Sequence, residues 1–548
     1  MAASEVHEDK CDGSNLMDVH SKAVVHLRAQ RQRQRLGLVF GSGVSKDLGF
    51  PDWRGLISRI AANPSVQAKS KIKDLIRQGV SNVASQATQS HIIFEHFRSR
   101  QLKKKRLTGS VPLLEEHRIK SDWLRIIHRE LYKDVDASKR TEDIDKHPYL
   151  TAFTEIIKES PLTVNYNFDD TLEKLLINSR TKDEQLTTRG YEVADQPSAQ
   201  FQNNSGVVYH PNGFIPSKFD DGTSAEVVFA NDAFQDQLLS AAHGRYVHLS
   251  NHLFRNTCLL IGLSLDDATL QSMLRQNAVS NPGHIHYFVY FVQTDGLSKD
   301  ARKTIFDANF SSYNLFTIFL DASGIRALAE LIRMPVKEFD QKFPPEKRKY
   351  VYYVIGSIGA GKSTAASNFR NLITYDEWID ERLPELAKPQ SEVDEEVVSD
   401  LDGWIATQFM KKNHALKDCR EGIHIVDRCP LDPLTFPGDR QSKAQKLLQT
   451  ITNNKSIPIE AGHVILLDCD FDELKLRNSL KHKYWSNREL KGLLEDIDEV
   501  YHRVEKTAVC TRGRDAAEVA REIAKVIFLA DYEPANISEH LRHFAGEE

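Results

Sequence analysis

The feature that most constrains the fold is a nine-residue segment in the second half of the chain, Gly356 to Thr364, which reads GSIGAGKST. It directly follows Tyr350–Ile355, an aromatic and β-branched run typical of a buried strand. In a GxxxxGKS loop the backbone amides and the start of the next helix surround a phosphate, and Gly356, Gly359 and Gly361 let the backbone approach it. The motif therefore predicts an α/β domain that binds nucleotide phosphates.

The side chains of this loop and of a later strand end predict how a nucleotide is held. Lys362 would neutralise phosphate oxygens and the Ser363 hydroxyl would ligate Mg²⁺, with Thr364 completing the motif. Asp427 and Arg428 end another apolar run, in VDRCP. A carboxylate and an arginine at a strand tip can hold Mg²⁺ or activate an acceptor while binding a phosphate. A strand-end cap is the alternative for Asp427, and ATP or another nucleotide is the expected ligand.

The region from Tyr350 to about Ala530 resembles the nucleoside and nucleoside-monophosphate kinases of the P-loop class. The resemblance is carried by GSIGAGKST, by IVDRCPLDP and by TRGRDAAEVAREI, and it implies a P-loop NTPase α/β domain. Asp376 and Glu377 in ITYDEW fall where such kinases often carry an acidic residue. A basic lid or an ordinary solvated helix face explains the cluster of Arg477, Lys481, Lys483 and Arg488.

The length of the chain, 548 residues, requires more than one domain. The short break PPEKRK separates two α/β patterns. We therefore expect a flexible tail over residues 1–20, a first domain over 21–343, a linker over 344–349 and a second domain over 350–548.

Composition limits the possible partners and compartment. The net charge of −5 gives no global basic field, so there is no strong nucleic-acid signal. The six cysteines include no CxxC pair, which excludes the usual zinc-site spacing. No apolar stretch approaches the length of a membrane span, and the N-terminus lacks the apolar core of a signal peptide. We expect a cytoplasmic protein whose partners are small nucleotides and not membranes.

The first half alternates short apolar runs with amphipathic helical stretches, which predicts a Rossmann-like parallel sheet with a helical insertion over about 60–121. The predicted strands are Leu36–Phe40, Leu162–Asn165, Val207–His210, Glu226–Phe229, Cys258–Gly262 and His286–Val292.

Four polar fragments accompany these runs. They are GSGVSKDLGFPDW from Gly41, NFDDTLE from Asn167, VYHPNGFIP from Val208 and LIGLSLDD from Leu260. Carboxyl ends of parallel strands share one edge of a sheet, which is where open α/β sheets bind ligands. We expect the fragments to lie together at that edge.

Together the fragments resemble the sirtuin-like NAD-hydrolase domains of bacterial antiphage defence proteins, over about Leu36 to Val292. The resemblance implies a fold that binds NAD and cuts its nicotinamide–ribose bond. It places Asn167 and Asp169 at the nicotinamide ribose. By the same resemblance, the pyrophosphate and adenosine sides are lined by Gly41, Ser42, Gly43, Ser45, Pro51, Trp53, Gly262 and Ser264.

The chemistry needs an amide that orients water and a base that takes its proton. Asn167 supplies the first, and His210 is the candidate for the second. The family usually carries histidine directly before the glycine of the third fragment, whereas this chain has Asn212 there. Either His210 serves as the base or the domain binds without cutting. Sirtuin deacylases carry a four-cysteine zinc module that is absent here, so lysine deacylation is not expected.

Three functions follow as hypotheses. In the first, the chain is an NAD hydrolase controlled by the C-terminal nucleotide-binding domain, an antiviral effector that works as a homo-oligomer. In the second, it is a nucleoside or nucleoside-monophosphate kinase with an NAD-binding regulatory domain. In the third, both pockets bind ligands and neither reacts.

Overall fold

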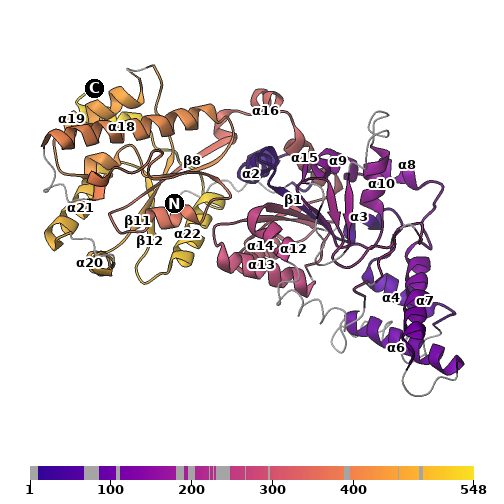
Figure 1. The fold of residues 1–548 in the computed structure, drawn as a ribbon. Helices are drawn as coiled ribbons and strands as arrows, with labels where there is room; N and C mark the ends of the chain where they lie inside the picture. The colour runs from indigo at the N-terminus through magenta and orange to yellow at the C-terminus, as the bar shows by residue number, and fades with distance from the viewer. Residues whose placement is uncertain are drawn as a thin grey trace.

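The fold contains two parallel β-sheets, one in each half of the chain (Figure 1). The structure, a computed structural model, describes residues 10–66, 86–105, 111–179, 191–195, 201, 204–220, 222–225, 227–229, 247–265, 267–293, 296–387, 395–453, 456–480 and 485–547. Every strand pairing in both sheets is parallel, which confirms the predicted α/β class.

The first sheet has seven strands in the order β3-β4-β2-β1-β5-β6-β7. The chain leaves β1 towards β2 on one side and later returns to β5 on the other, so the topology switches direction at β1. Ligands of open α/β sheets bind in the crevice at such a point. The strands are β1 (Leu36–Phe40), β2 (Thr163–Asn165), β3 (Glu192–Ala194), β4 (Val207–Tyr209), β5 (Thr257–Ile261), β6 (His286–Phe291) and β7 (Leu315–Leu320).

Five of the six predicted strands are present, and their bounds differ by at most one residue at either end. The prediction of a strand over Glu226–Phe229 is wrong for its described part: Val227–Phe229 forms a loop in which the Phe229 amide bonds to the Val227 carbonyl. The Val228 amide instead donates to the Asn212 carbonyl (2.8 Å), so this apolar segment covers the third fragment.

Helices cover both faces of the first sheet and form a separate arm (Figure 1). The arm contains α4, α6 and α7, which have their own apolar core around Trp123 and Ile127, and it accounts for the expected helical insertion. The helices of this half are α3 (Gly43–Lys46), α4 (Trp53–Ala62), α6 (Gln86–Lys104), α7 (Leu113–Leu131), α8 (Arg140–Asp145), η1 (Leu150–Phe153), α9 (Thr154–Glu159), α10 (Thr171–Asn178), α12 (Val247–Arg255), α13 (Ala268–Ser280), α14 (Lys299–Tyr313), α15 (Ala322–Arg333) and α16 (Val336–Lys342).

The second sheet has five strands in the order β12-β11-β8-β10-β9. Its strands are β8 (Lys349–Ile355), β9 (Ile373–Tyr375), β10 (Gly422–Asp427), β11 (His463–Asp468) and β12 (Lys506–Cys510). Its helices are η2 (Pro345–Lys347), α17 (Lys362–Ser367), η3 (Pro384–Ala387), α18 (Glu395–Asp418), η5 (Asp432–Thr435), α19 (Arg440–Ile451), α20 (Phe471–Leu480), α21 (Asn487–Val500), α22 (Ala516–Phe528) and α23 (Ile537–Ala545). No helix in the described ranges combines the length and apolarity needed to cross a membrane.

The expectation of a flexible tail over residues 1–20 is wrong for its described part. Residues 16–19 form α1, in which Leu16 and Met17 are buried. The Asp321 amide donates to the Cys11 carbonyl (2.9 Å), which attaches the segment to the start of α15. Apolar anchors and a backbone bond therefore fix the second half of the expected tail.

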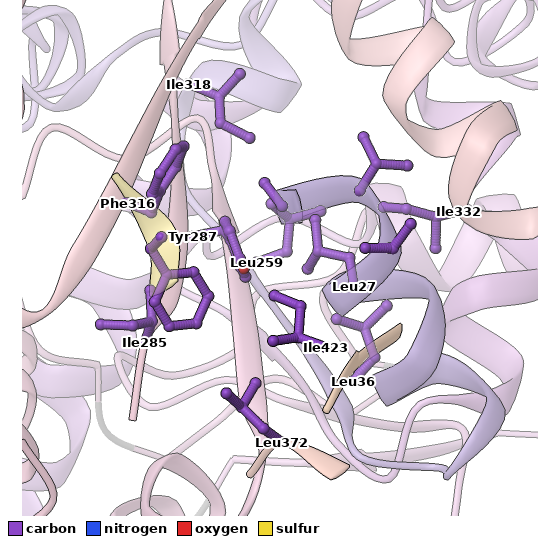
Figure 2. Close-up of a cluster of buried hydrophobic side chains, with 14 of the residues drawn as sticks. Leu27, Leu36, Leu259, Ile285, Tyr287, Phe316, Ile318, Ile332, Leu372 and Ile423 are labelled. Atoms are coloured by element: carbon purple, nitrogen blue, oxygen red, sulfur yellow. The ribbon is translucent and has the colours of Figure 1, made fainter. Parts of the chain in front are cut away.

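Helix α2 (Ser21–Gln32) joins the two halves. Its eight central residues, Ala23 to Gln30, are all buried, which is expected of a helix that is covered on every side. Side chains of both sheets meet around it: Figure 2 shows Leu27 and Leu259 of the first half close to Leu372 and Ile423 of the second. The two halves thus share one hydrophobic core.

Candidate functional site

The first glycine loop lies at the switch point of the first sheet, against the end of β5. The Gly41 amide donates to the Ile261 carbonyl and the Gly43 amide to the Gly262 carbonyl, both at 2.9 Å. A Cβ on Gly41 would lie 2.5 Å from the Gly262 oxygen, and one on Gly43 would lie 2.9 Å from the Gly262 Cα. These glycines therefore allow two strand ends to approach each other. The local sequence motif does not reveal this requirement for glycine.

Asn167 connects two of the predicted fragments. It follows β2, and its side-chain amide donates to the Gly41 carbonyl (3.0 Å) and to the Ser45 hydroxyl (3.1 Å). Its own backbone amide donates to the Asn165 side chain (3.1 Å). The buried Asn167 Oδ1 has no hydrogen-bond partner within the described part of the chain. The loop is thus held in place while one amide oxygen stays free to accept a hydrogen bond.

His210, at the end of β4, is completely buried beneath Asn167. Its Nδ1 donates to the Asn167 carbonyl (2.8 Å) and its Nε2 lies 2.8 Å from Glu173 Oε1. Burial alone would lower the His210 pKa, but the Glu173 carboxylate and the Asn167 carbonyl outweigh it and the pKa is raised. Neither ring nitrogen is free to take a proton from water. The geometry therefore argues against the base role that we expected and favours His210 as a residue that positions Asn167.

Asp169 is the second acidic group of this site and is also buried. Its Oδ1 accepts from the Thr171 amide (3.0 Å), and the Ser45 hydroxyl also bonds to this carboxyl. Burial raises the Asp169 pKa, and the hydrogen bonds and the nearby Arg140 charge offset only part of that rise. A carboxyl whose pKa is raised towards neutrality suits proton transfer.

The other predicted residues of the first site have mixed surroundings. Ser42, Gly43 and Ser264 are exposed at the sheet edge. Trp53, the first residue of α4, packs at a tilt against Phe168 and Phe229, with ring centroids 5.6 and 5.1 Å apart, and so joins the arm to the Asn167 fragment.

Asn212 is buried, and its side chain lies 3.5 Å from the Tyr166 carbonyl. Pro51 is half-buried beside the start of α4, whose first turn is capped by the Asp52 carboxylate.

The predicted phosphate loop lies between β8 and α17. Gly356, Gly359 and Gly361 have positive φ values of 148°, 88° and 101°, which favour glycine. Lys362 is buried, and its ammonium donates to the carbonyls of Gly356 (2.7 Å) and Ser357 (3.0 Å). Burial lowers the Lys362 pKa to about 8. Ser363 and Thr364 are exposed at the start of the helix.

Charged groups surround this loop at the end of β10. The Asp427 side chain is buried, and its Oδ1 has no hydrogen-bond partner among the described residues, which suits a cation ligand. Arg428 has φ 74° and donates through Nε to Glu377 Oε1 (2.9 Å). Lys412, which sequence reasoning missed, donates to the Asp427 carbonyl (2.7 Å), and burial lowers its pKa to about 8. No sequence motif marks Lys412, because it reaches the site from the C-terminal half of α18.

Part of the predicted basic lid contacts the phosphate loop. Arg477 of α20 donates to the Ala360 carbonyl (3.0 Å) and pairs with Glu473. Lys481 and Lys483 lie outside the described residues, and Arg488 lies in the first turn of α21. Of the two described residues of this cluster, Arg477 is the one that contacts the loop.

Comparisons with known proteins each cover about a third of the chain or less. Residues 161–328 match the SIR2-like domain family, which confirms the predicted sirtuin-like character for that range. Two structures of deoxyadenosine kinase from M. mycoides, one with dCMP and dCDP and one with dATP, are similar to the chain at 15% and 17% identity. Each covers 32% of this chain and 95% or 96% of its own, with TM-scores of 0.24 and 0.25. No match was found among curated proteins.

Proposed function

We propose that the first half of the chain hydrolyses NAD at its nicotinamide–ribose bond. The observation that carries the proposal is the contact between Asn167 and the Gly41–Ser45 loop, which brings two separate fragments to one strand edge and leaves the Asn167 amide oxygen free. The SIR2-like match over 161–328 supports a nicotinamide dinucleotide as the substrate.

The proposed reaction adds water to the ribose carbon as the glycosidic bond breaks, and nicotinamide leaves with the bonding electrons. The free oxygen of Asn167 accepts a hydrogen bond from the water and orients it. Asp169 takes the proton, because it is a buried carboxyl beside Asn167 with a raised pKa. His210 holds the Asn167 backbone from below.

The experiment that tests this function follows nicotinamide release by chromatography, with and without added nucleotides. Asn167→Ala removes the amide, and we expect a loss of about 10²–10³-fold in rate. Asn309→Ala is the matched control: Asn309 also donates to a hydroxyl, Thr317 Oγ1 at 3.0 Å, but it lies in α14. A wild-type protein that leaves NAD intact under every nucleotide tested would disprove the hydrolase.

We further propose that a nucleotide in the second half controls this activity. Ser363 and Asp427 would hold Mg²⁺ with the nucleotide phosphates. Helix α17 runs from the phosphate loop to the domain junction, where Asn368 approaches Gly283 so closely that a Cβ there would lie 2.5 Å from the Asn368 oxygen.

Helix α2 supplies a second connection. Arg28 forms a buried ion pair with Glu421 (2.8 Å) directly before β10, and Gln30 donates to the carbonyl of Asn371 (2.6 Å), which lies just upstream of β9. The same helix leads into β1, whose end carries Gly41. Control requires two conformations of the protein that the nucleotide binds with different affinity. Helix α2 contacts both halves, so a change of conformation at the nucleotide site could alter the position of the Gly41 loop through it.

The biological role that we propose is antiviral: the enzyme depletes NAD in an infected bacterium and works as a homo-oligomer. The support is the sequence resemblance to antiphage effectors. Phage plaque counts on cells that express the wild type or Asn167→Ala test the role, and sedimentation tests the assembly. Equal plaque counts would contradict it.

A nucleotide kinase is the second candidate function, because the Glu377–Arg428 pair, Asp427 and Lys362 lie at one site. Incubation with ATP and nucleosides or their monophosphates, followed by product analysis, tests this. Phosphorylated product that disappears in Lys362→Ala would support the kinase.

A further inference from the structure

A buried carboxylate next to Asp169 contacts three other segments of the first half. Asp170 receives the Arg140 guanidinium, the Tyr132 hydroxyl (2.9 Å) and both the amide (3.0 Å) and the hydroxyl (2.8 Å) of Ser217. Tyr132 follows the last turn of the arm helix α7, and Arg140 opens α8. Ser217 follows the fragment that begins at Val208. None of the sequence motifs includes Arg140, whereas Asp170 lies within the NFDDTLE fragment.

Arg140 is held by aromatic rings and by one ion pair. Its guanidinium lies 5.4 Å from the centre of the Phe50 ring and 5.1 Å from that of Tyr132, and 6% of the residue is exposed. Its Nε and Nη1 are buried and have no hydrogen-bond partner in the described ranges. Only one guanidinium nitrogen of Arg140 forms a hydrogen bond with a described residue. Its charge therefore accounts for more of its effect on the site than it would in an arginine whose nitrogens were all hydrogen-bonded.

We propose that the buried Arg140–Asp170 pair positions Asp169 in the NAD site and sets the charge around it. The inference rests on the proposed NAD hydrolysis. Asp169 and Asp170 are adjacent, so a displacement of Asp170 moves the Asp169 backbone. The Phe50 contact extends the pair to the glycine loop, which makes Arg140 a link between the first fragment and the Asn167 fragment.

The charged and titratable groups that face Asp169 allow an electrostatic effect of this pair to be distinguished from a purely structural one. They are Arg140, Asp170, His210 and the Tyr132 hydroxyl. Arg140 lowers the Asp169 pKa and Asp170 raises it, with the Arg140 contribution the larger. Tyr132 is neutral near physiological pH, because burial raises its pKa well above 10. Two variants that break the same pair thus act on Asp169 in opposite directions.

The experiment measures the pH dependence of kcat for nicotinamide release in Arg140→Gln and Asp170→Asn. We expect both variants to lose kcat, on the order of 10²-fold, since a small misplacement of a reacting group is costly. The acidic limb of the profile should move to higher pH in Arg140→Gln and to lower pH in Asp170→Asn. Tyr132→Phe removes the hydrogen bonds of the hydroxyl with Asp170 and with the Ile215 carbonyl but no charge, so its limb should stay at the wild-type position.

If the acidic limb of the pH profile stays in place, or moves in the same direction in both variants, the inference is wrong. The proposed NAD hydrolysis would not be affected by that result. A wild type that does not cleave NAD defeats the proposed function instead. If a single variant does not fold, the double variant Arg140→Gln/Asp170→Asn replaces the ion pair with two neutral amides. Its limb should move to higher pH, by less than Arg140→Gln alone, and an unmoved or lowered limb overturns the inference.

Discussion

The two glycine loops of this chain use the same residue for different physical reasons. In the phosphate loop, Gly359 and Gly361 have positive φ, and a Cβ on Gly361 would meet no described atom within 4 Å. In the first loop, Gly41 and Gly43 have no positive φ, but a Cβ on either would collide with the backbone of Gly262. Gly359 and Gly361 thus serve the conformation of their own loop, whereas Gly41 and Gly43 allow a distant strand end to approach. Gly356 combines both reasons, because its φ is 148° and a Cβ there would lie 2.9 Å from the Leu467 oxygen.

This difference decides how much each loop reveals in the sequence. A conformational requirement repeats at fixed spacing, so GxxxxGKS is recognisable without its tertiary partners. A packing requirement depends on Gly262, more than two hundred residues away. The first loop is therefore ambiguous by itself and becomes informative only when its partner fragments are considered with it.

The largest effect that we predict for this comparison is on stability, in Gly41→Ala. The added methyl group would lie 2.5 Å from the Gly262 oxygen, which is backbone and cannot rotate away. We expect a loss of about 2–3 kcal/mol in the free energy of unfolding, the usual cost of overpacking. Urea unfolding followed by circular dichroism measures it.

The matched control is Gly492→Ala in α21, where the methyl group meets no described atom within 4 Å and alanine favours the helix. A Gly41→Ala protein as stable as this control would show that the first loop opens easily and that the packing explanation is wrong.

Gly361→Ala should have a smaller effect. The site has room for a methyl group, so the cost comes from φ 101° alone, which we expect to be about 1–2 kcal/mol. Urea unfolding of Gly361→Ala and Gly41→Ala under the same conditions shows which of the two loses more free energy of unfolding. If Gly361→Ala were the more destabilising, the proposed distinction between conformation and packing would be reversed.

The fold follows from the sequence where the signal is local. Strand β1 matches its prediction at both ends, and β8 starts one residue early, because both are apolar runs that end at glycine turns. The three-residue strands β3 and β9 are absent from the predicted set, because they are mostly half-buried and give a weak apolar signal, whereas the equally short β2 and β4 are fully buried. Strand β7 has a readable apolar run, LFTIFL, that the predicted set lacks.

The sites follow from the sequence less completely. Asn167 and Gly41 are predictable neighbours, because both follow strands at one sheet edge. Arg140 and Lys412 are not, because each reaches its site from a helix through tertiary contacts that no local pattern encodes. The base role expected for His210 depends on which groups occupy its two ring nitrogens, and no motif encodes that.

Each site contains a buried side chain that can carry a positive charge, Lys362 in the second half and His210 in the first, and each predicts a dependence on pH. Burial lowers the Lys362 pKa to about 8, and a bound phosphate would favour its charged form. Nucleotide affinity should therefore fall above pH 8, by up to about tenfold per unit from this one group. Calorimetric titration with ATP at pH 7 to 9.5 measures the slope. Lys362→Arg keeps the charge, so its slope should be shallower, and an unchanged slope would exclude Lys362 as the source.

The smallest effect that we predict concerns His210, whose pKa shifts in the opposite direction to that of Lys362. Its pKa is raised in the folded protein, where Glu173 outweighs the cost of burial. Below the unfolded pKa, near 6.5, both states bind the proton and the Glu173 interaction stabilises the fold fully. As the pH rises through the folded pKa, the proton and this stabilisation are lost. The difference in unfolding free energy between wild type and Glu173→Gln should thus be larger at pH 6 than at pH 9.

Glu155→Gln is the control. It removes an exposed carboxylate paired with Lys158, so its unfolding free energy should follow that of the wild type at both pH values. A Glu173→Gln difference that is constant with pH would mean that His210 stays neutral, and its Nε2 would then be available to accept a proton after all.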